Sequence, residues 1–146
     1  MHAGENARVL VIDDDEIVLE VITSLLITAG YQVQCLASPI GATQIIATQQ
    51  IQAVIVDLNM PVMQGDRFIA LLRSWDRIRD VPTILLSSAP AATLNAVAKE
   101  LPGVATVSKT TMHRALPETL QRVLARARAT GAANTAPGGT ARRKGT

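Results

Sequence analysis

The chain has 146 residues, 48% of them hydrophobic, and a formal net charge of +2 at pH 7, which allows one domain of ordinary size followed by a tail. Residues 130–146 carry three basic residues and no acidic one, so residues 1–129 hold eleven basic and twelve acidic side chains and a net charge of −1. This balance argues against nucleic-acid binding driven by net charge, and three aromatic residues are too few for a base-stacking surface.

Targeting and redox signals are sparse. Cys35 is the lone cysteine and lies in an alternating stretch, so we expect a buried strand thiol, no disulfide and a reduced, cytoplasmic setting. Residues 1–7 lack a basic region followed by an apolar run, and no run of 18 apolar residues could cross a bilayer. We therefore expect a soluble, unexported protein that contacts no membrane.

Short apolar runs alternate five times with longer stretches of helical periodicity. Strands are predicted over residues 8–12, 32–36, 53–56, 83–86 and 104–107. The first helix is capped by Asp14 or Asp15, the second opens at Ser38-Pro39, and the third follows Gly65. The last two helices are predicted over residues 91–99 and 112–129.

Apolar residues at helical spacing predict the faces that the helices bury. In the first helix they are Ile17, Val18, Val21, Ile22, Leu25 and Leu26, and in the second Ile40, Ile45 and Ile46. In the last helix they are Met112, Leu116, Leu120, Val123, Leu124 and Ala127, and the residues outside that stripe are Arg114, Glu118, Arg122 and Arg126.

Continuous apolar strands joined by helices predict an α/β fold over residues 8–129, with a doubly wound five-stranded parallel sheet and five helices. Residues 1–7 and the basic tail 130–146 have little to bury, and we predict that both are disordered.

Polar and charged side chains follow the predicted strands at the points where the strands end. Asp13 and Asp14 follow the first strand, Asp57 the third, Ser87 the fourth and Lys109 the fifth. The carboxyl ends of parallel strands share one edge, where ligands bind. Three carboxylates gathered there repel one another, and an oxygen-lined acidic site suits Mg²⁺. A carboxylate beside that ion can attack a phosphoryl group, so Asp57 is the candidate nucleophile, Lys109 its counter-charge and Ser87 a hydroxyl donor.

Each of these residues also has an ordinary structural explanation. Asp14 could cap a helix, Lys109 could be a solvated loop lysine, and Ser87 and Asn59 could be turn residues. Their joint placement at one edge of the predicted sheet favours the functional interpretation.

Four segments resemble the signature segments of a known family: VLVIDDD at 9–15, DLNMPVMQG at 57–65, PTILLSS at 82–88 and VSK at 107–109. Together they are similar to the receiver domains of two-component response regulators, which are CheY-like, over about residues 7–128. The resemblance implies a phosphoacceptor in a signalling relay, with no turnover of a separate substrate.

The resemblance also implies roles for individual residues. Asp57 accepts a phosphoryl group from a sensor histidine kinase or a phosphotransfer protein and pairs with Lys109. Asp14, the Asp57 carboxylate and the Asn59 main-chain carbonyl bind Mg²⁺, and Asp13 acts mainly through bound water. Ser87 turns toward the phosphoryl group. The change reaches a downstream effector protein, or an attached domain, through the face of the fourth helix, fifth strand and fifth helix, in a monomer or weak homodimer.

The chain departs from the family pattern at three positions. Thr110 follows Lys109 where the family usually has a proline after a cis peptide, so we expect a trans bond or a reshaped loop there. Thr106 stands where many members carry a switching aromatic residue, and Gln64 replaces a common acid.

Three alternatives follow from the same residues. A phosphatase or phosphotransferase with an aspartyl-phosphate intermediate needs a second acid two residues after the nucleophile, where this chain has Asn59. A flavodoxin-like cofactor binder needs a phosphate-binding loop after the first strand, and the sequence has none. Nucleic-acid binding through Arg142, Arg143 and Lys144 would be weak, and we expect none.

Overall fold

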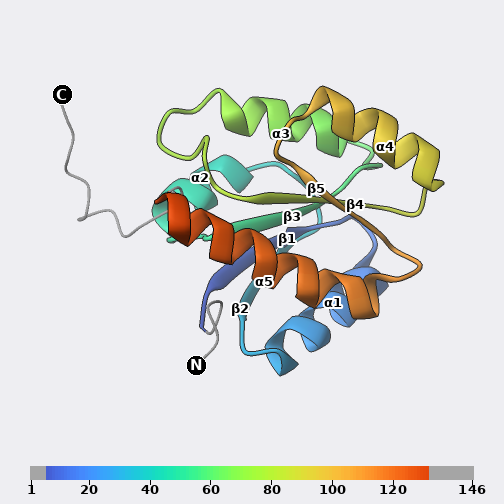
Figure 1. Cartoon of the computed structure of the whole chain (residues 1–146), viewed down its shortest axis with the longest axis horizontal. Coiled ribbons are helices and arrows are strands. Elements are labelled where there is room, and N and C mark those ends of the chain that lie inside the picture. The colour runs from blue at the N-terminus through green and yellow to red at the C-terminus, as the bar shows by residue number, and fades with distance from the viewer. Residues whose placement is uncertain (1–5, 132–146) are drawn as a thin grey trace.

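The computed structural model describes residues 6–131, in which a parallel sheet lies between two layers of helices (Figure 1). The elements are β1 (Arg8–Ile12), α1 (Glu16–Thr28), β2 (Gln32–Leu36), α2 (Ala42–Thr48), β3 (Ala53–Asp57), α3 (Gly65–Arg73), β4 (Thr83–Ser87), α4 (Ala91–Glu100), β5 (Ala105–Ser108) and α5 (Met112–Thr130). All strand pairs are parallel, in the order β2-β1-β3-β4-β5. The predicted doubly wound α/β fold is confirmed.

Helices cover both faces of the sheet, which explains why its central strands are continuously apolar. Strands β3 and β4 are buried along their whole length. Alternate residues of β1 point to opposite faces, so Leu10 and Ile12 pack with residues of α2, α3 and α4, whereas Val9 and Val11 pack with α1 and α5. The two hydrophobic cores hold the strand ends in fixed positions.

The strand order reverses at β1, which pairs with β2 on one side and β3 on the other. In open α/β sheets this reversal opens a crevice at the carboxyl ends of the strands. Ile12 pairs in register with Val56, so the next residues, Asp13 and Asp57, lie beside each other at that edge. The topology therefore brings together two acids that are 44 positions apart in the chain.

Two predictions about β2 and α2 were wrong. Cys35 is exposed, because β2 is an edge strand, and its sulfur lies 3.1 Å from Thr23 Oγ1. Helix α2 begins after Gly41, whose φ of 82° is left-handed, and not at Ser38. The Ser38 hydroxyl accepts the Ile40 N–H at 3.2 Å in a local turn that competes with the helix, and Ile40 is 74% exposed.

Helix α1 buries fewer of its apolar residues than predicted. Its buried residues are Leu19, Ile22 and Leu26, whereas Ile17 and Val21 are 72% and 43% exposed. Periodicity could not define the buried stripe because this helix is apolar on nearly every side. In α5, by contrast, four of the six residues of the predicted stripe, Leu116, Leu120, Leu124 and Ala127, are buried, and the other two, Met112 and Val123, are partly buried.

The domain extends slightly beyond its predicted limits. Asn6 donates its N–H to the Gly30 carbonyl at 2.8 Å, Ala7 is 1% exposed, and α5 continues to Thr130. The rest of the two segments predicted to be disordered, residues 1–5 and 132–146, lies outside the described residues. Within residues 6–131, no helix is both long and apolar enough to span a membrane.

Candidate functional site

Asp13 is fully buried at the end of β1, and its backbone neighbours hold its carboxylate in place. Oδ1 of Asp13 accepts the Asp15 N–H at 2.9 Å. The Asp15 side chain in turn accepts the N–H groups of Ile17 and Val18 as the N-cap of α1. Asp15 is therefore the cap, and Asp14 is exposed and takes no part in capping.

Asp57 is the last residue of β3 and is only 4% exposed. One carboxylate oxygen from each of Asp13, Asp14 and Asp57 lies within 4.8 Å of the other two. Hard cations such as Mg²⁺ are bound by clustered carboxylate oxygens of this kind. The three acids could therefore hold a metal ion, with Asp14 on the solvent side.

The surroundings of Asp57 disfavour its charged form. Burial raises the pKa of its carboxyl group, and the negative charge of Asp13 raises the pKa further. The Lys109 ammonium and the backbone N–H of Asn59 lower the pKa, but they do not offset the other effects. Without a metal ion, the positive charge near Asp57 is therefore too small to bring the pKa of its carboxyl group down to the ordinary value.

Lys109 supplies that positive charge in part. Its Nζ lies 2.9 Å from Asp13 Oδ2 and 3.3 Å from Asp57 Oδ1. Burial alone would lower the pKa of the ammonium, but the hydrogen bond to Asp13 and the negative charges of Asp57 and Asp13 outweigh it and raise the pKa. The resemblance implied a pairing with Asp57, and in the structure Asp13 is the nearer partner.

The backbone holds Lys109 at the site without a cis peptide bond. Its N–H donates to the Ser87 carbonyl at 2.8 Å, which joins the ends of β4 and β5. Residues 6–131 contain no cis peptide bond, so the Lys109–Thr110 bond is trans, as expected from the threonine. The Thr110 N–H and hydroxyl both lie within hydrogen-bond distance of Ser108 Oγ, at 3.2 and 2.8 Å.

Ser87 is fully buried at the end of β4. Its Oγ accepts the Ala89 N–H at 2.9 Å, and an accepting hydroxyl keeps its own proton available for donation. Asp57 pairs in register with Leu86, the residue before Ser87. The Ser87 hydroxyl therefore lies at the end of β4, next to the strand that ends in Asp57 and at the same edge of the sheet.

The loop after β3 supplies the remaining residues of the site. Asn59 is exposed, and its backbone N–H bonds to the Asp57 carboxylate. Gly65 closes the loop by donating its N–H to the Leu58 carbonyl at 2.8 Å. A Cβ atom at Gly65 would lie 2.4 Å from the Asp57 carbonyl oxygen, so no other residue fits there without moving the backbone. Sequence reasoning did not find this steric role, although Gly65 ends the segment on which the resemblance rests.

Fold and site together define a doubly wound α/β protein with a lysine-paired carboxylate cluster at the point where the strand order reverses. Comparison with known sequences leads to the same class of protein and identifies the family. The sequence model of the response regulator receiver domain family matches residues 9–121, so the chain belongs to that family.

Relatives and solved structures agree with this assignment. The chain is 35% identical over 81 residues to the transcriptional regulatory protein PrrA of Mycobacterium tuberculosis. The matched segment covers 56% of this chain and 34% of that protein. It is 31% identical over 82 residues to the response regulator protein FleR of Pseudomonas aeruginosa, covering 56% and 17%. The chain thus spans about a third or less of these relatives.

Among solved structures, chemotaxis protein CheY4 of Vibrio cholerae has a TM-score of 0.72 at 27% identity, with 81% of this chain and 98% of that one covered. A putative response regulator from Chloroflexus aurantiacus has a TM-score of 0.77 at 24% identity, with 84% and 100% covered, and supports the fold alone.

Proposed function

We propose that this domain accepts a phosphoryl group on Asp57 and signals through the conformational change that follows. The observation that carries the proposal is the position of Asp57: a buried carboxylate whose oxygen lies within 4.8 Å of oxygens from Asp13 and Asp14 and 3.3 Å from the Lys109 ammonium. Phosphoryl transfer places negative charge on the transferred group, and such a site can neutralise that charge.

The proposed donor is a phosphohistidine on a sensor histidine kinase or a phosphotransfer protein. A carboxylate oxygen of Asp57 attacks the phosphorus, and the O–P bond forms as the N–P bond breaks. The electron pair of that bond returns to the imidazole nitrogen, which takes up a proton as it leaves. Burial of Asp57 limits the access of water to the nucleophile, and the Lys109 ammonium faces the oxygens on which negative charge develops.

The residues at the site fit Mg²⁺. Asp13, Asp14, Asp57 and the main-chain carbonyl of Asn59 would hold the ion, and all four supply the oxygen ligands that it prefers. When bound, Mg²⁺ would neutralise the three carboxylates and the incoming phosphoryl oxygens. The exposed Asp14 would be the carboxylate most easily reached from solvent.

The signal would leave the site through Ser87 and Lys109. The Ser87 hydroxyl can donate to a new phosphoryl oxygen, a bond worth roughly 0.5–1.5 kcal/mol, and Lys109 connects the same edge to α5. Thr106 is partly buried on β5 and lacks the volume of an aromatic side chain. We therefore propose a small population shift over α4 and β5 that a downstream effector or attached domain detects, within a cytoplasmic protein.

The enzymatic alternative has less support. Asn59 stands where an aspartyl-phosphate phosphatase or phosphotransferase needs a second acid, and an amide cannot transfer protons. The family to which the chain belongs generally serves signalling and not turnover of a substrate. Sustained hydrolysis of an added phosphate ester, at many equivalents per protein, would favour the enzyme instead.

Intact-mass measurement tests the proposal directly. The protein is incubated with acetyl phosphate as a small phosphodonor, with Mg²⁺ or with a chelator, and compared with Asp57→Asn. We expect one phosphoryl group on the parent only with Mg²⁺, stable in acid and lost in base, and none on the variant. Stoichiometric, persistent labelling of Asp57→Asn contradicts the assignment.

A further inference from the structure

A cavity with a mostly polar lining lies at the amino-terminal edge of the sheet, at the opposite end of the strands from Asp57. Its volume of about 360 Å³ is within the range of sites that hold small molecules. It lies between the loop that follows α3 and the loop that follows α4, and Figure 1 shows the loop after α3 at the end of the molecule away from the start of α1. The residues that line it include Arg73, Arg79, Asp80, Thr83, Pro102 and Gly103.

Arg73 is held at the wall of this cavity by a contact with the backbone. It is the last residue of α3, and its Nη2 donates to the Pro102 carbonyl at 2.7 Å. The next residue, Gly103, has a left-handed φ of 87°, and a Cβ atom there would lie 3.6 Å from Nη2. The guanidinium has five N–H groups, and Arg73 forms no ion pair with any residue of 6–131. Its positive charge is therefore fixed in place and available to bind an anion.

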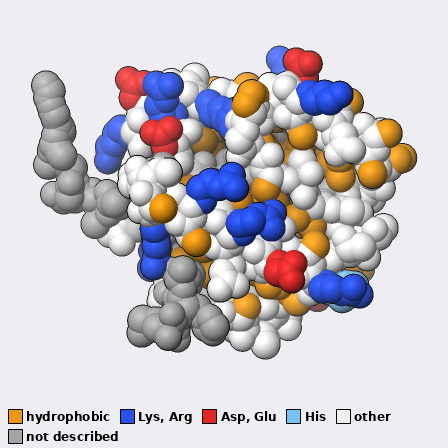
Figure 2. All heavy atoms as spheres, in the orientation of Figure 1, with side chains coloured by type: hydrophobic (Ala, Val, Ile, Leu, Met, Phe, Trp, Pro, Cys, Tyr) orange, Lys and Arg blue, Asp and Glu red, His pale blue; other side chains and the backbone are white. Residues whose placement is uncertain are grey.

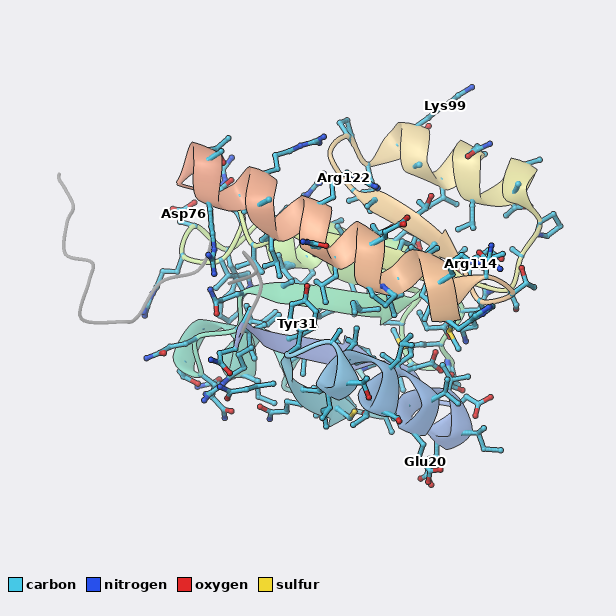
Figure 3. The ribbon with its side chains drawn as sticks, turned by 60° about the horizontal axis from the view of Figure 1, so that its bottom comes forward. Glu20, Tyr31, Asp76, Lys99, Arg114 and Arg122 are labelled. Carbon is cyan, nitrogen blue, oxygen red and sulfur yellow. The ribbon has the colours of Figure 1, made fainter. Side chains whose placement is uncertain are left out.

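Arg79 supplies a second positive charge from the loop before β4. Within the described part of the chain its one ion pair is with Asp76, at 3.7 Å, and the Asp76 side chain is 96% exposed. An exposed pair of this kind contributes little, so Arg79 can leave it for a ligand at small cost. Asp76 is labelled in Figure 3, at the opposite end of the molecule from Arg114 near the start of α5. At the left of Figure 2, Lys and Arg side chains gather with Asp and Glu side chains over this loop.

The hydroxyl of Thr83 is a buried polar group without a protein partner. Thr83 begins β4 and is 5% exposed, and its hydroxyl makes no hydrogen bond to another residue of 6–131. Thr83 pairs in register with Val54, whose side chain belongs to the core on the α3 and α4 side of the sheet, so the hydroxyl also lies on the side of the cavity. Buried hydroxyl groups usually have a hydrogen-bond partner, and an occupant of the cavity would supply the missing one.

Asp80 indicates that the occupant is more than a bare anion. Its carboxylate lines the same cavity, but among the described residues it forms no ion pair with Arg73 or Arg79. Residues 73–80 hold three basic and two acidic side chains, so a net charge of +1 remains beside the cavity. Arginine binds phosphate oxygens through paired N–H groups, whereas a carboxylate accepts hydrogen bonds from hydroxyl groups.

We propose that this cavity binds a small phosphate ester that carries hydroxyl groups, the chemistry of a sugar phosphate. The phosphate group binds Arg73 and Arg79 and accepts a hydrogen bond from Thr83, and a hydroxyl group of the same ligand donates to Asp80. The cavity and Asp57 lie at opposite edges of the sheet, so binding requires neither Mg²⁺ nor a phosphoryl group on Asp57.

Ribose 5-phosphate is a suitable probe, added to the full chain in the presence of a chelator so that the acidic cluster holds no metal ion. Chemical shifts of the backbone amides, measured by NMR, locate the binding and give its affinity. We expect saturable shifts at residues 79–83 and 102–103, with a dissociation constant of about 1 mM, which is ordinary for a ligand of about 14 non-hydrogen atoms. Inorganic phosphate should bind more weakly because it lacks the contact with Asp80, and ribose should not bind.

Three variants test the contacts. Arg79→Gln should weaken binding about tenfold or more, because it removes a charged contact with the phosphate. Arg77→Gln is the matched control in the same loop: Arg77 is exposed and does not line the cavity, so binding should stay within about twofold of the parent. Thr83→Val keeps the branched side chain and removes the hydroxyl. It should weaken binding about threefold or more, while the melting temperature of the free protein stays the same or rises.

The absence of saturable shifts up to about 20 mM ribose 5-phosphate overturns the proposal. So does an equal loss of affinity in Arg77→Gln and Arg79→Gln, which would mean diffuse attraction and not a site. Inorganic phosphate or ribose that binds as tightly as the ester contradicts the choice of ligand. A lower melting temperature for Thr83→Val would show that the hydroxyl already has a partner in the protein and would remove it from the site.

Discussion

Replacing Lys109 with methionine removes the ammonium from the acidic cluster while keeping most of the side chain's length. Its Nζ lies 2.9 Å from Asp13 Oδ2 and 3.3 Å from Asp57 Oδ1. At an effective dielectric constant of about 20, these attractions amount to about 6 and about 5 kcal/mol before desolvation is subtracted. Removing one partner of a buried pair costs about 3–5 kcal/mol, and because the Lys109 side chain is 18% exposed we expect a loss of about 2–3 kcal/mol.

The same substitution should strengthen Mg²⁺ binding. The ammonium contacts two of the carboxylates that would hold the ion and therefore competes with it. We expect Lys109→Met to tighten Mg²⁺ binding by about tenfold or more, equivalent to about 1.4 kcal/mol, whereas Lys109→Arg keeps the charge and stays closer to the parent. Urea unfolding in a chelator measures the stability, and titration calorimetry measures the affinity for Mg²⁺. Unchanged stability together with unchanged affinity would refute the reasoning.

A double-mutant cycle identifies which acid Lys109 holds. The contact with Asp13 has the length of a normal charge-assisted hydrogen bond, whereas the contact with Asp57 is longer than such bonds usually are. The coupling energy of Lys109 with Asp13 should therefore exceed its coupling with Asp57 when each acid is changed to asparagine. A larger coupling with Asp57 contradicts this geometry.

Further predictions concern three other residues. Asp57→Asn should raise the melting temperature of the metal-free protein near pH 7 by about 4 °C, on the order of 1 kcal/mol, because the raised pKa of Asp57 means that its charged form destabilises the fold. The pKa of Asp57 is higher in the folded protein than in the unfolded chain, so the gain in melting temperature should shrink as the pH falls through the folded-state pKa and vanish below the unfolded-state pKa. A gain that does not depend on pH would contradict this explanation. Gly65→Ala should destabilise the domain by about 2 kcal/mol or more, because the new Cβ would meet the Asp57 carbonyl oxygen, and unchanged urea unfolding would show that the loop gives way easily. Ser87→Ala should still be phosphorylated but lose much of the phosphorylation-dependent change in hydrogen exchange over residues 88–112, and a full response would place the coupling elsewhere.

The fold was predictable because its signals are local and mutually consistent. Every strand except β2 is a short apolar run that ends at a polar residue, and a longer helical stretch follows each strand, so the amino-acid pattern alone was enough to gather the strand ends at one edge of the sheet. Predicted bounds of α4, β5 and α5 differ from the observed ones by about one residue. These agreements depend on patterns of several residues and not on single contacts.

The errors occurred where a single contact or a position in the sheet decides the outcome. Cys35 alternates with polar neighbours as a buried residue would, but β2 is an edge strand and leaves it exposed. The turn made by the Ser38 hydroxyl delays α2 and turns Ile40 outward. Both outcomes depend on strand order and on local hydrogen bonds, which periodicity does not report.

The sequence indicated which residues the candidate site brings together but not the distances between them. Strand ends identified its residues, but no sequence pattern indicates that Lys109 approaches Asp13 more closely than Asp57. The steric need for Gly65 likewise arises from the return of the loop onto the Asp57 carbonyl, a contact between backbone segments. Distances of this kind are set by the packing of whole elements.

Reductive trapping tests the central claim, that Asp57 is the phosphoacceptor, most directly. Borohydride reduces an acyl phosphate on aspartate to the alcohol of homoserine, and peptide mass mapping then locates the modified residue. After incubation with acetyl phosphate and Mg²⁺, we predict homoserine at position 57 and unmodified aspartate at positions 13 and 14. Homoserine at position 13 or 14, with position 57 unmodified in a fully phosphorylated sample, would contradict the account.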